Sequence, residues 1–208
     1  MPADHLPTPP PTRHPATEQV LPEPRAGRAR YRIGLICLGN ICRSPMADVV
    51  LEARLDGAGL GEVVEVASAG TGDWHVGRPM DRRAAGTLER AGYDPSRHRA
   101  RQIADSWFED CDLLLAMDRD NLADLLGSRA ASQVPRDRLR LFRDFDPVDP
   151  GGEVPDPYYG GPDGFEEVLT MVERTAGALV EQVERQLGRQ LGGRLGTRLG
   201  HRLGEARP

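Results

Sequence analysis

Apolar and polar residues alternate with two different periods along the middle of the chain. Short apolar runs, typical of buried strands, occur at 31–37, 63–67, 112–117 and 138–142. Apolar residues with helical spacing of three and four occur at 44–58, 80–91, 118–126 and 164–186. Because strands and helices alternate, we expect an α/β fold with a doubly wound, four-stranded parallel sheet and helices on both faces. Ligands of such sheets bind beyond the carboxyl ends of the strands.

Both ends of the chain depart from this pattern. Residues 1–28 hold eight of the 18 prolines and show almost no apolar periodicity, so we expect this segment to be disordered. In the segment 185–208, leucine and glycine each recur at every fourth residue as far as residue 204. Each interior glycine costs a helix about 1 kcal/mol relative to alanine, so we expect the last helix to end near residue 187. The domain itself is assigned to residues 29–184.

Composition and charge narrow the class of protein. The chain has 208 residues, enough for one α/β domain. A membrane-spanning helix needs about 18 consecutive apolar residues, and no apolar run in the sequence is nearly that long. Three cysteines argue against a disulfide scaffold and indicate a reducing, cytoplasmic compartment. The net charge is −5, yet residues 185–208 are basic. Such a tail can contact nucleic acid or an acidic partner, but it has no interleaved aromatic residues for base stacking, which favours a solvated, low-complexity extension.

The first predicted strand leads into a segment with the chemistry of an anion-binding loop, Cys37-Leu38-Gly39-Asn40-Ile41-Cys42-Arg43-Ser44-Pro45. Backbone N–H groups at a helix N-terminus can converge on a tetrahedral oxyanion, and Gly39 and Asn40 suit the tight turn. The planar fork of Arg43 would bind two phosphate oxygens. The same field, with a hydrogen bond from Ser44, would favour a nucleophilic thiolate on Cys37. The alternative is a buried cysteine at a strand end, because the Cys-x5-Arg spacing alone also arises by chance.

A second segment, 154–161, can supply an acid. Asp156 lies between two prolines, which restrict the backbone, so its carboxyl group could be held over the loop and protonate a leaving phenolate. An ordinary surface turn explains the same residues equally well. No close cluster of histidine, cysteine and carboxylate side chains suggests a metal, and we expect no cofactor.

Several motifs together resemble the low-molecular-weight protein tyrosine phosphatases. They are CLGNICRSP, SAGT at 68–71, WHVG at 74–77, HRARQI at 98–103, AMDRDN at 116–121 and VPDPYYGG at 154–161. The resemblance covers about residues 32–183 and includes neither tail. It implies a flavodoxin-like, phosphatase I-like fold and a metal-independent hydrolysis of phosphotyrosine in proteins and of small aryl phosphates, through a phosphocysteine intermediate.

The resemblance also implies roles for individual residues. Cys37 would be the nucleophile, Arg43 the phosphate-binding residue and Asp156 the general acid. The loop residues Leu38, Gly39, Asn40, Ile41, Cys42 and Ser44 would bind the phosphoryl group. Cys42 would also form a reversible, protective disulfide with the nucleophile; the alternative is a small buried residue. The walls of the substrate pocket would be formed by Leu38, Ile41, Trp74, Tyr158 and Tyr159. His75, Asp118 and Asn121 would have supporting roles.

Other functions fit parts of the sequence. Thiol-dependent arsenate reductases have a similar fold and loop, but those with an internal relay place two further cysteines on and after the third strand, where this chain has Ala116 and Met117. A non-catalytic phosphopeptide-binding module would normally lack the nucleophile or the acid. An adaptor for nucleic acid or membranes would act through the Arg/Gly/Leu tail, with the phosphatase domain as a passenger.

Overall fold

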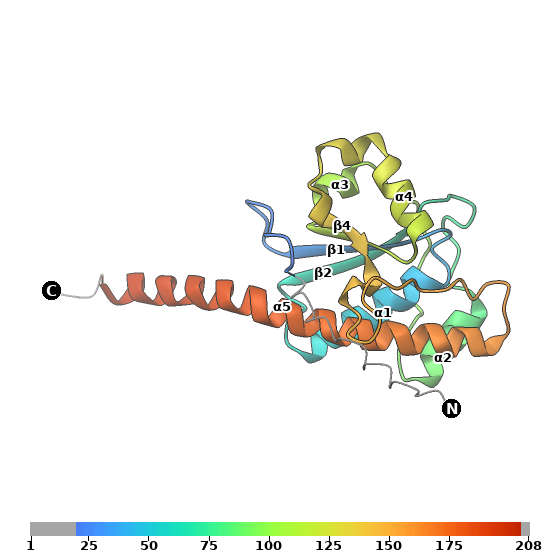
Figure 1. Ribbon diagram of the computed structural model, residues 1–208. Coiled ribbons are helices and arrows are strands. Elements are labelled where there is room, and N and C mark those ends of the chain that lie inside the picture. Colours follow the sequence, from blue (N-terminus) through green and yellow to red (C-terminus); the bar gives the residue numbers. More distant parts are fainter. Residues whose placement is uncertain (1–19, 205–208) are drawn as a thin grey trace, which may run out of the picture.

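The computed structural model describes residues 20–204, apart from the side chains of Pro162 and of the residues after Gln186. Its centre is a four-stranded parallel sheet, which confirms the predicted fold (Figure 1). The strands in spatial order are β2 (Val64–Gly70), β1 (Tyr31–Cys37), β3 (Leu113–Ala116) and β4 (Leu139–Leu141).

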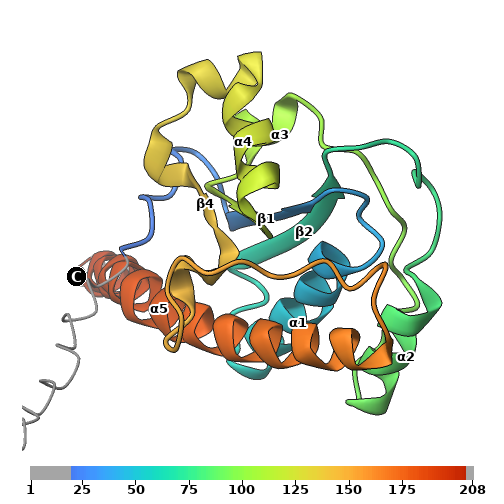
Figure 2. The same ribbon diagram turned by 45° about the vertical axis from the view of Figure 1, so that its right-hand side comes forward.

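Helices cover both faces of the sheet (Figure 2). One face carries α1 (Arg43–Gly57), α2 (Arg82–Arg90) and α5 (Pro162–Gly204), and the other carries α3 (Ser106–Asp110) and α4 (Arg119–Gly127). Neighbouring side chains of β1 point to opposite faces, so Ile33 and Leu35 belong to the core under α1 and α5, whereas Ile36 belongs to the smaller core under α3 and α4. Three 3-10 turns flank β4, at Arg129–Gln133, Arg136–Arg138 and Phe142–Phe145.

The strand order places a topological switch point beside β1. The chain leaves β1 through α1 to reach β2 on one side, then returns across β1 to form β3 on the other side. The connections after β1 and β3 therefore diverge, and a crevice opens at their carboxyl ends. Cys37 is the last residue of β1, so the fold places the predicted nucleophile at this crevice.

The structure differs from the predicted disorder at the end of the N-terminal segment. Residues 20–28, here called the N-terminal strap, pack on the domain. The backbone of Leu21 exchanges two hydrogen bonds with the side-chain amide of Gln186, at 2.9 and 2.7 Å. The Arg25 N–H donates to Asp112 Oδ1 at 2.7 Å, and its guanidinium donates to the Phe108 and Cys111 carbonyls. Side chains of the domain thus provide hydrogen-bond partners for backbone N–H and C=O groups of the strap, although its sequence has no periodic apolar pattern. Residues 1–19 lie outside the described part of the chain.

The last helix also differs from the prediction, because α5 does not end near residue 187 but continues to Gly204. The four-residue repeat is close to the helical period, and leucine, arginine and glutamine between the glycines are strong helix formers. Figure 1 shows this end of α5 projecting beyond the domain. Within residues 20–204, no helix is long and apolar enough to cross a membrane.

Candidate active site

The loop that joins β1 to α1, residues 37–44 and here called the phosphate loop, wraps around the sulfur of Cys37. Asn40 adopts a positive φ of 53°, which asparagine tolerates better than most residues. This turn directs the Asn40 N–H to Cys37 Sγ at 3.2 Å. The structure thus has a concave loop at the N-terminus of α1, a geometry that suits an anion.

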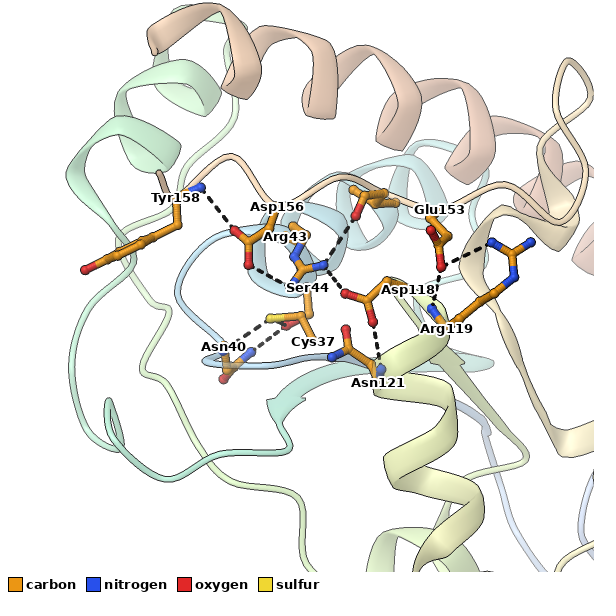
Figure 3. Close-up of polar contacts among 11 residues, drawn as sticks. Cys37, Asn40, Arg43, Ser44, Asp118, Arg119, Asn121, Glu153, Asp156 and Tyr158 are labelled. Atoms are coloured by element: carbon orange, nitrogen blue, oxygen red, sulfur yellow. Dashed lines mark hydrogen bonds and ion pairs between the residues drawn. The ribbon is translucent and has the colours of Figure 1, made fainter. Parts of the chain in front are cut away.

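A chain of buried hydrogen bonds supports the sulfur from the other side (Figure 3). The Asn40 amide donates to Ser44 Oγ at 2.9 Å, which leaves the Ser44 hydroxyl proton free to donate to Cys37 Sγ at 3.1 Å. With the Asn40 N–H, two donors therefore face one sulfur atom. Two donors stabilise an anionic sulfur more than a neutral thiol, because the hydrogen bonds are stronger to the charged form.

Residues distant in sequence hold Asn40 in place. His98 Nε2 lies 2.8 Å from the Asn40 carbonyl, to which it can only donate, and the Arg101 N–H donates to Asn40 Oδ1 at 2.9 Å. Burial lowers the pKa of His98 despite this hydrogen bond. At Gly70, a Cβ atom would lie 2.6 Å from the Leu38 carbonyl oxygen. His98 and Gly70 belong to the motifs HRARQI and SAGT, but the sequence predicted no role for either residue.

The Arg43 side chain links three loops beneath the cavity. It is only 3% exposed, and its Nη1 pairs with Asp118, which follows β3. Its Nη2 pairs with Asp156 at 2.9 Å, and Nη1 also donates to the Val154 carbonyl at 3.3 Å. Burial opposes the charge of Arg43, but the nearby Cys37, Asp118 and Asp156 outweigh burial and raise its pKa. Asp118 therefore contacts the phosphate-binding candidate directly.

Asp156 extends over the cavity from the segment between the 3-10 turns and α5. The next residue, Pro157, has no N–H, and Asp156 Oδ1 instead accepts the N–H of Tyr158 at 3.0 Å. The segment is anchored to the sheet where the Val154 N–H donates to the Met117 carbonyl at 2.8 Å. The Asp156 side chain is 43% exposed, so one face of its carboxyl group reaches the cavity.

The cavity above the sulfur has a volume of about 250 Å³. Its lining brings together the predicted catalytic residues, most of the loop and the predicted walls: Cys37, Leu38, Gly39, Ile41, Cys42, Arg43, Trp74, His75, Asp156, Tyr158 and Tyr159. Asn40 and Ser44, the remaining residues of the loop, do not line the cavity and are fully buried. The two tyrosine rings meet edge to face at 5.0 Å, and Trp74 is 70% exposed at the rim. Aromatic walls of this kind accept a flat ring.

The three cysteines are free thiols. Cys42 is buried beside the nucleophile candidate and lines the same cavity; burial, reinforced by Asp81, raises its pKa. Cys111 lies before β3, at the other end of the sheet, and burial raises its pKa to about 12. Among residues 20–204, no group of three or more histidine, cysteine and acidic side chains is placed to hold a metal ion.

Comparisons with known proteins agree with this geometry. Residues 32–189 match the family model described as low molecular weight phosphotyrosine protein phosphatase. A low molecular weight protein-tyrosine-phosphatase of Streptomyces coelicolor is 48% identical over 161 residues, 76% of this chain and 96% of the relative. The low molecular weight protein-tyrosine phosphatase A of Mycobacterium bovis is 44% identical, over 74% of this chain and 93% of the relative.

Solved structures give the same result for the fold. A protein tyrosine phosphatase from Entamoeba histolytica, crystallised with Hepes in its active site, superposes with a TM-score of 0.67 at 33% identity and covers 74% of this chain and 97% of that one. YfkJ from Bacillus subtilis superposes with a TM-score of 0.67 at 30% identity and covers 77% and 99% of the two chains.

Proposed function

The chain belongs to the low molecular weight phosphotyrosine protein phosphatase family and hydrolyses phosphotyrosine, and from this premise we propose that Cys37 is its nucleophile. One observation carries the proposal: Cys37 Sγ receives two hydrogen bonds at the base of a cavity that Arg43 and Asp156 also line. The names of the relatives argue against the arsenate reductase and binding-module alternatives.

The reaction has two steps in this proposal. The Cys37 thiolate attacks phosphorus in line with the aryl oxygen, so a P–S bond forms as the P–O bond to the ring breaks. Asp156 gives its proton to the departing phenolate. Water then attacks the phosphocysteine while Asp156 accepts a proton from it, which releases inorganic phosphate and restores the thiolate. The electron pairs and protons balance without an added cofactor.

Arg43 and the phosphate loop stabilise the transferring group. Loop N–H groups and the guanidinium converge where negative charge develops on the equatorial oxygens. A phosphoryl group in the loop would compete with Asp156 for Arg43 Nη2, which now pairs with that carboxylate at 2.9 Å. Substrate binding would thus weaken the ion pair of Asp156 and free its carboxyl group to face the leaving oxygen.

The walls select the substrate class. Trp74, Tyr158 and Tyr159 would contact the ring of a phosphotyrosine, whereas phosphoserine is too short to reach both the rim and the sulfur. The substrates are therefore proposed to be tyrosine-phosphorylated proteins. Cys42 would protect Cys37 by forming a disulfide after oxidation. The three free thiols support a cytoplasmic location.

Turnover of an aryl phosphate and of a phosphotyrosine peptide in EDTA tests the mechanism. The Cys37→Ser variant should have no measurable turnover, and Asp156→Asn should lose about 10²- to 10⁴-fold with the poor leaving group of the peptide. Cys111→Ser is the matched control because it removes a thiol outside the cavity. Wild-type levels of activity in Cys37→Ser would refute the proposed nucleophile.

A further inference from the structure

A second cavity adjoins the catalytic one. Its volume is about 420 Å³, and it shares Leu38 and Trp74 with the catalytic cavity. We call it the flanking groove. The Trp74 ring packs against the backbone of Gly72, where a Cβ atom would lie only 1.8 Å from the ring. The Trp74 indole, the partition between the two cavities, therefore separates the phosphate loop on one side from the flanking groove on the other.

The floor of the flanking groove is apolar. It is formed where the loop after β2 approaches α3 and the end of α4, on the sheet face opposite α1 and α5 (Figure 2). Phe108 and Leu125 are almost fully buried under it, and Ile103 is partly exposed. An extended side chain laid in the groove would bury its carbon atoms against these residues and against Trp74.

Two carboxylates lie at the rim of this floor. Asp105 precedes α3 and Asp124 belongs to α4, and both are exposed. Neither side chain forms a hydrogen bond or ion pair with any residue of the described part of the chain. No arginine lines the groove, whereas Arg43 lines the catalytic cavity. Carboxylates are thus the only charged groups among the residues that line the flanking groove, whereas the catalytic cavity holds Arg43 together with Asp156.

We propose that the flanking groove binds a lysine or arginine side chain of the substrate, a few residues from the phosphotyrosine. This inference rests on the proposed function and deepens it. The aliphatic stem of such a residue matches the apolar floor, and its cation matches the unpaired carboxylates. Because adjacent residues of an extended peptide are about 3.3–3.6 Å apart, a side chain near the phosphotyrosine can cross the Trp74 partition. A glutamate in the same place would meet two like charges.

A peptide series tests this specificity. One phosphotyrosine peptide is made with arginine, alanine or glutamate at each of the three positions on either side, and kcat/KM is measured at low ionic strength. At one or more positions arginine should exceed glutamate by about three- to tenfold, as expected for partly exposed charges. The Asp105→Asn/Asp124→Asn double variant should reduce that ratio to below about twofold while hydrolysing a small aryl phosphate at the wild-type rate. Added salt should reduce the wild-type ratio in the same way.

The matched control is Asp137→Asn, which removes an exposed carboxylate next to the amino end of β4 and should keep the wild-type ratio. Equal rates for arginine and glutamate peptides at every position would overturn the inference, as would a ratio that persists in the double variant. Failure of the proposed function is distinguishable from failure of this inference, because the wild-type protein would then not hydrolyse the aryl phosphate. In that event, fluorescence anisotropy of the labelled peptides would still decide whether arginine improves binding through Asp105 and Asp124.

Discussion

The two ends of the sheet are both held by buried arginine–aspartate pairs, but the pairs differ in what surrounds them. At the carboxyl end, Arg43 divides its guanidinium between Asp118 and Asp156, and Asp156 remains partly exposed to a cavity. At the amino end, Asp112 is fully buried; it pairs with the Arg138 guanidinium at 3.5 Å and accepts the backbone N–H groups of Arg25 and Arg32 at 2.7 and 2.8 Å. The saturated pair can only hold the fold together, whereas the pair that borders a cavity can exchange a partner.

The largest loss of activity should come from a change in Arg43, whose partner Asp156 borders the cavity. Arg43→Lys keeps the charge but loses the planar fork, so kcat should fall by about 10²- to 10³-fold. Steady-state kinetics with an aryl phosphate measures this loss. Arg138→Lys is the control at the other end, where Arg138 donates to the Asp112 and Glu23 carbonyls. An Arg138→Lys variant as impaired in kcat as Arg43→Lys would remove the distinction between the two ends.

The converse variant, Asp112→Asn, should act on stability instead. It removes a buried charge that two N–H groups and Arg138 share, so the free energy of unfolding should fall by about 3 kcal/mol. Urea denaturation measures the change, with Asp137→Asn as the exposed control. The folded variant should retain wild-type kcat, and a large loss of kcat at full stability would contradict the comparison.

A smaller loss of activity is expected at Gly70, whose backbone packs against the phosphate loop at Leu38. Gly70→Ala would place a methyl group 2.6 Å from the Leu38 carbonyl oxygen, so the loop must shift. We expect kcat to fall by about tenfold or more and stability by about 1–3 kcal/mol. Gly57→Ala is the control, because a Cβ atom there meets nothing within 4 Å. Equal behaviour of the two variants would show that the loop tolerates the displacement.

The smallest effect is a pH dependence near the same loop. Burial raises the pKa of Asp48 to about 6, despite its hydrogen bond from Ser68. The folded protein thus binds this proton more tightly than the unfolded chain, in which the pKa of aspartate is about 3.9. The stabilisation is complete below about pH 4 and is lost as the pH rises through about 6. Asp48→Asn should therefore exceed wild type in stability by about 1–2 kcal/mol at pH 8 but not at pH 4, as measured by urea denaturation.

The parts of the site that are local in sequence could be predicted, and the tertiary parts could not. The apolar run 31–37 and the following helix placed Cys37 and Arg43 correctly at a strand end and a helix start, because periodicity and loop chemistry act within a few residues. The role of Gly70 depends on the pairing of β1 with β2, which sets it opposite Cys37. His98 reaches Asn40 across 58 residues, so no local pattern reveals it.

The same reasoning explains the errors in the fold. Helix α3 has five residues, too few for a period to be recognised. The N-terminal strap has little apolar surface, and the Asp112 carboxylate and the Gln186 amide hold it instead. Because these partners lie 87 and 165 residues away in sequence, a proline-rich segment with packed backbone is indistinguishable in sequence from a disordered one.

Helix α5 begins directly after the segment 154–161, which carries Asp156, and runs past the opposite end of the domain (Figure 1). At 1.5 Å per residue, the turns after Gln186 would extend about 27 Å beyond the last described contact of the helix with the N-terminal strap. Such an arm makes the molecule tumble anisotropically and increases its greatest dimension in solution. The arm also fixes how the enzyme would be oriented: a surface that binds the end of the arm would hold the domain at a distance, with the catalytic cavity facing away from that surface.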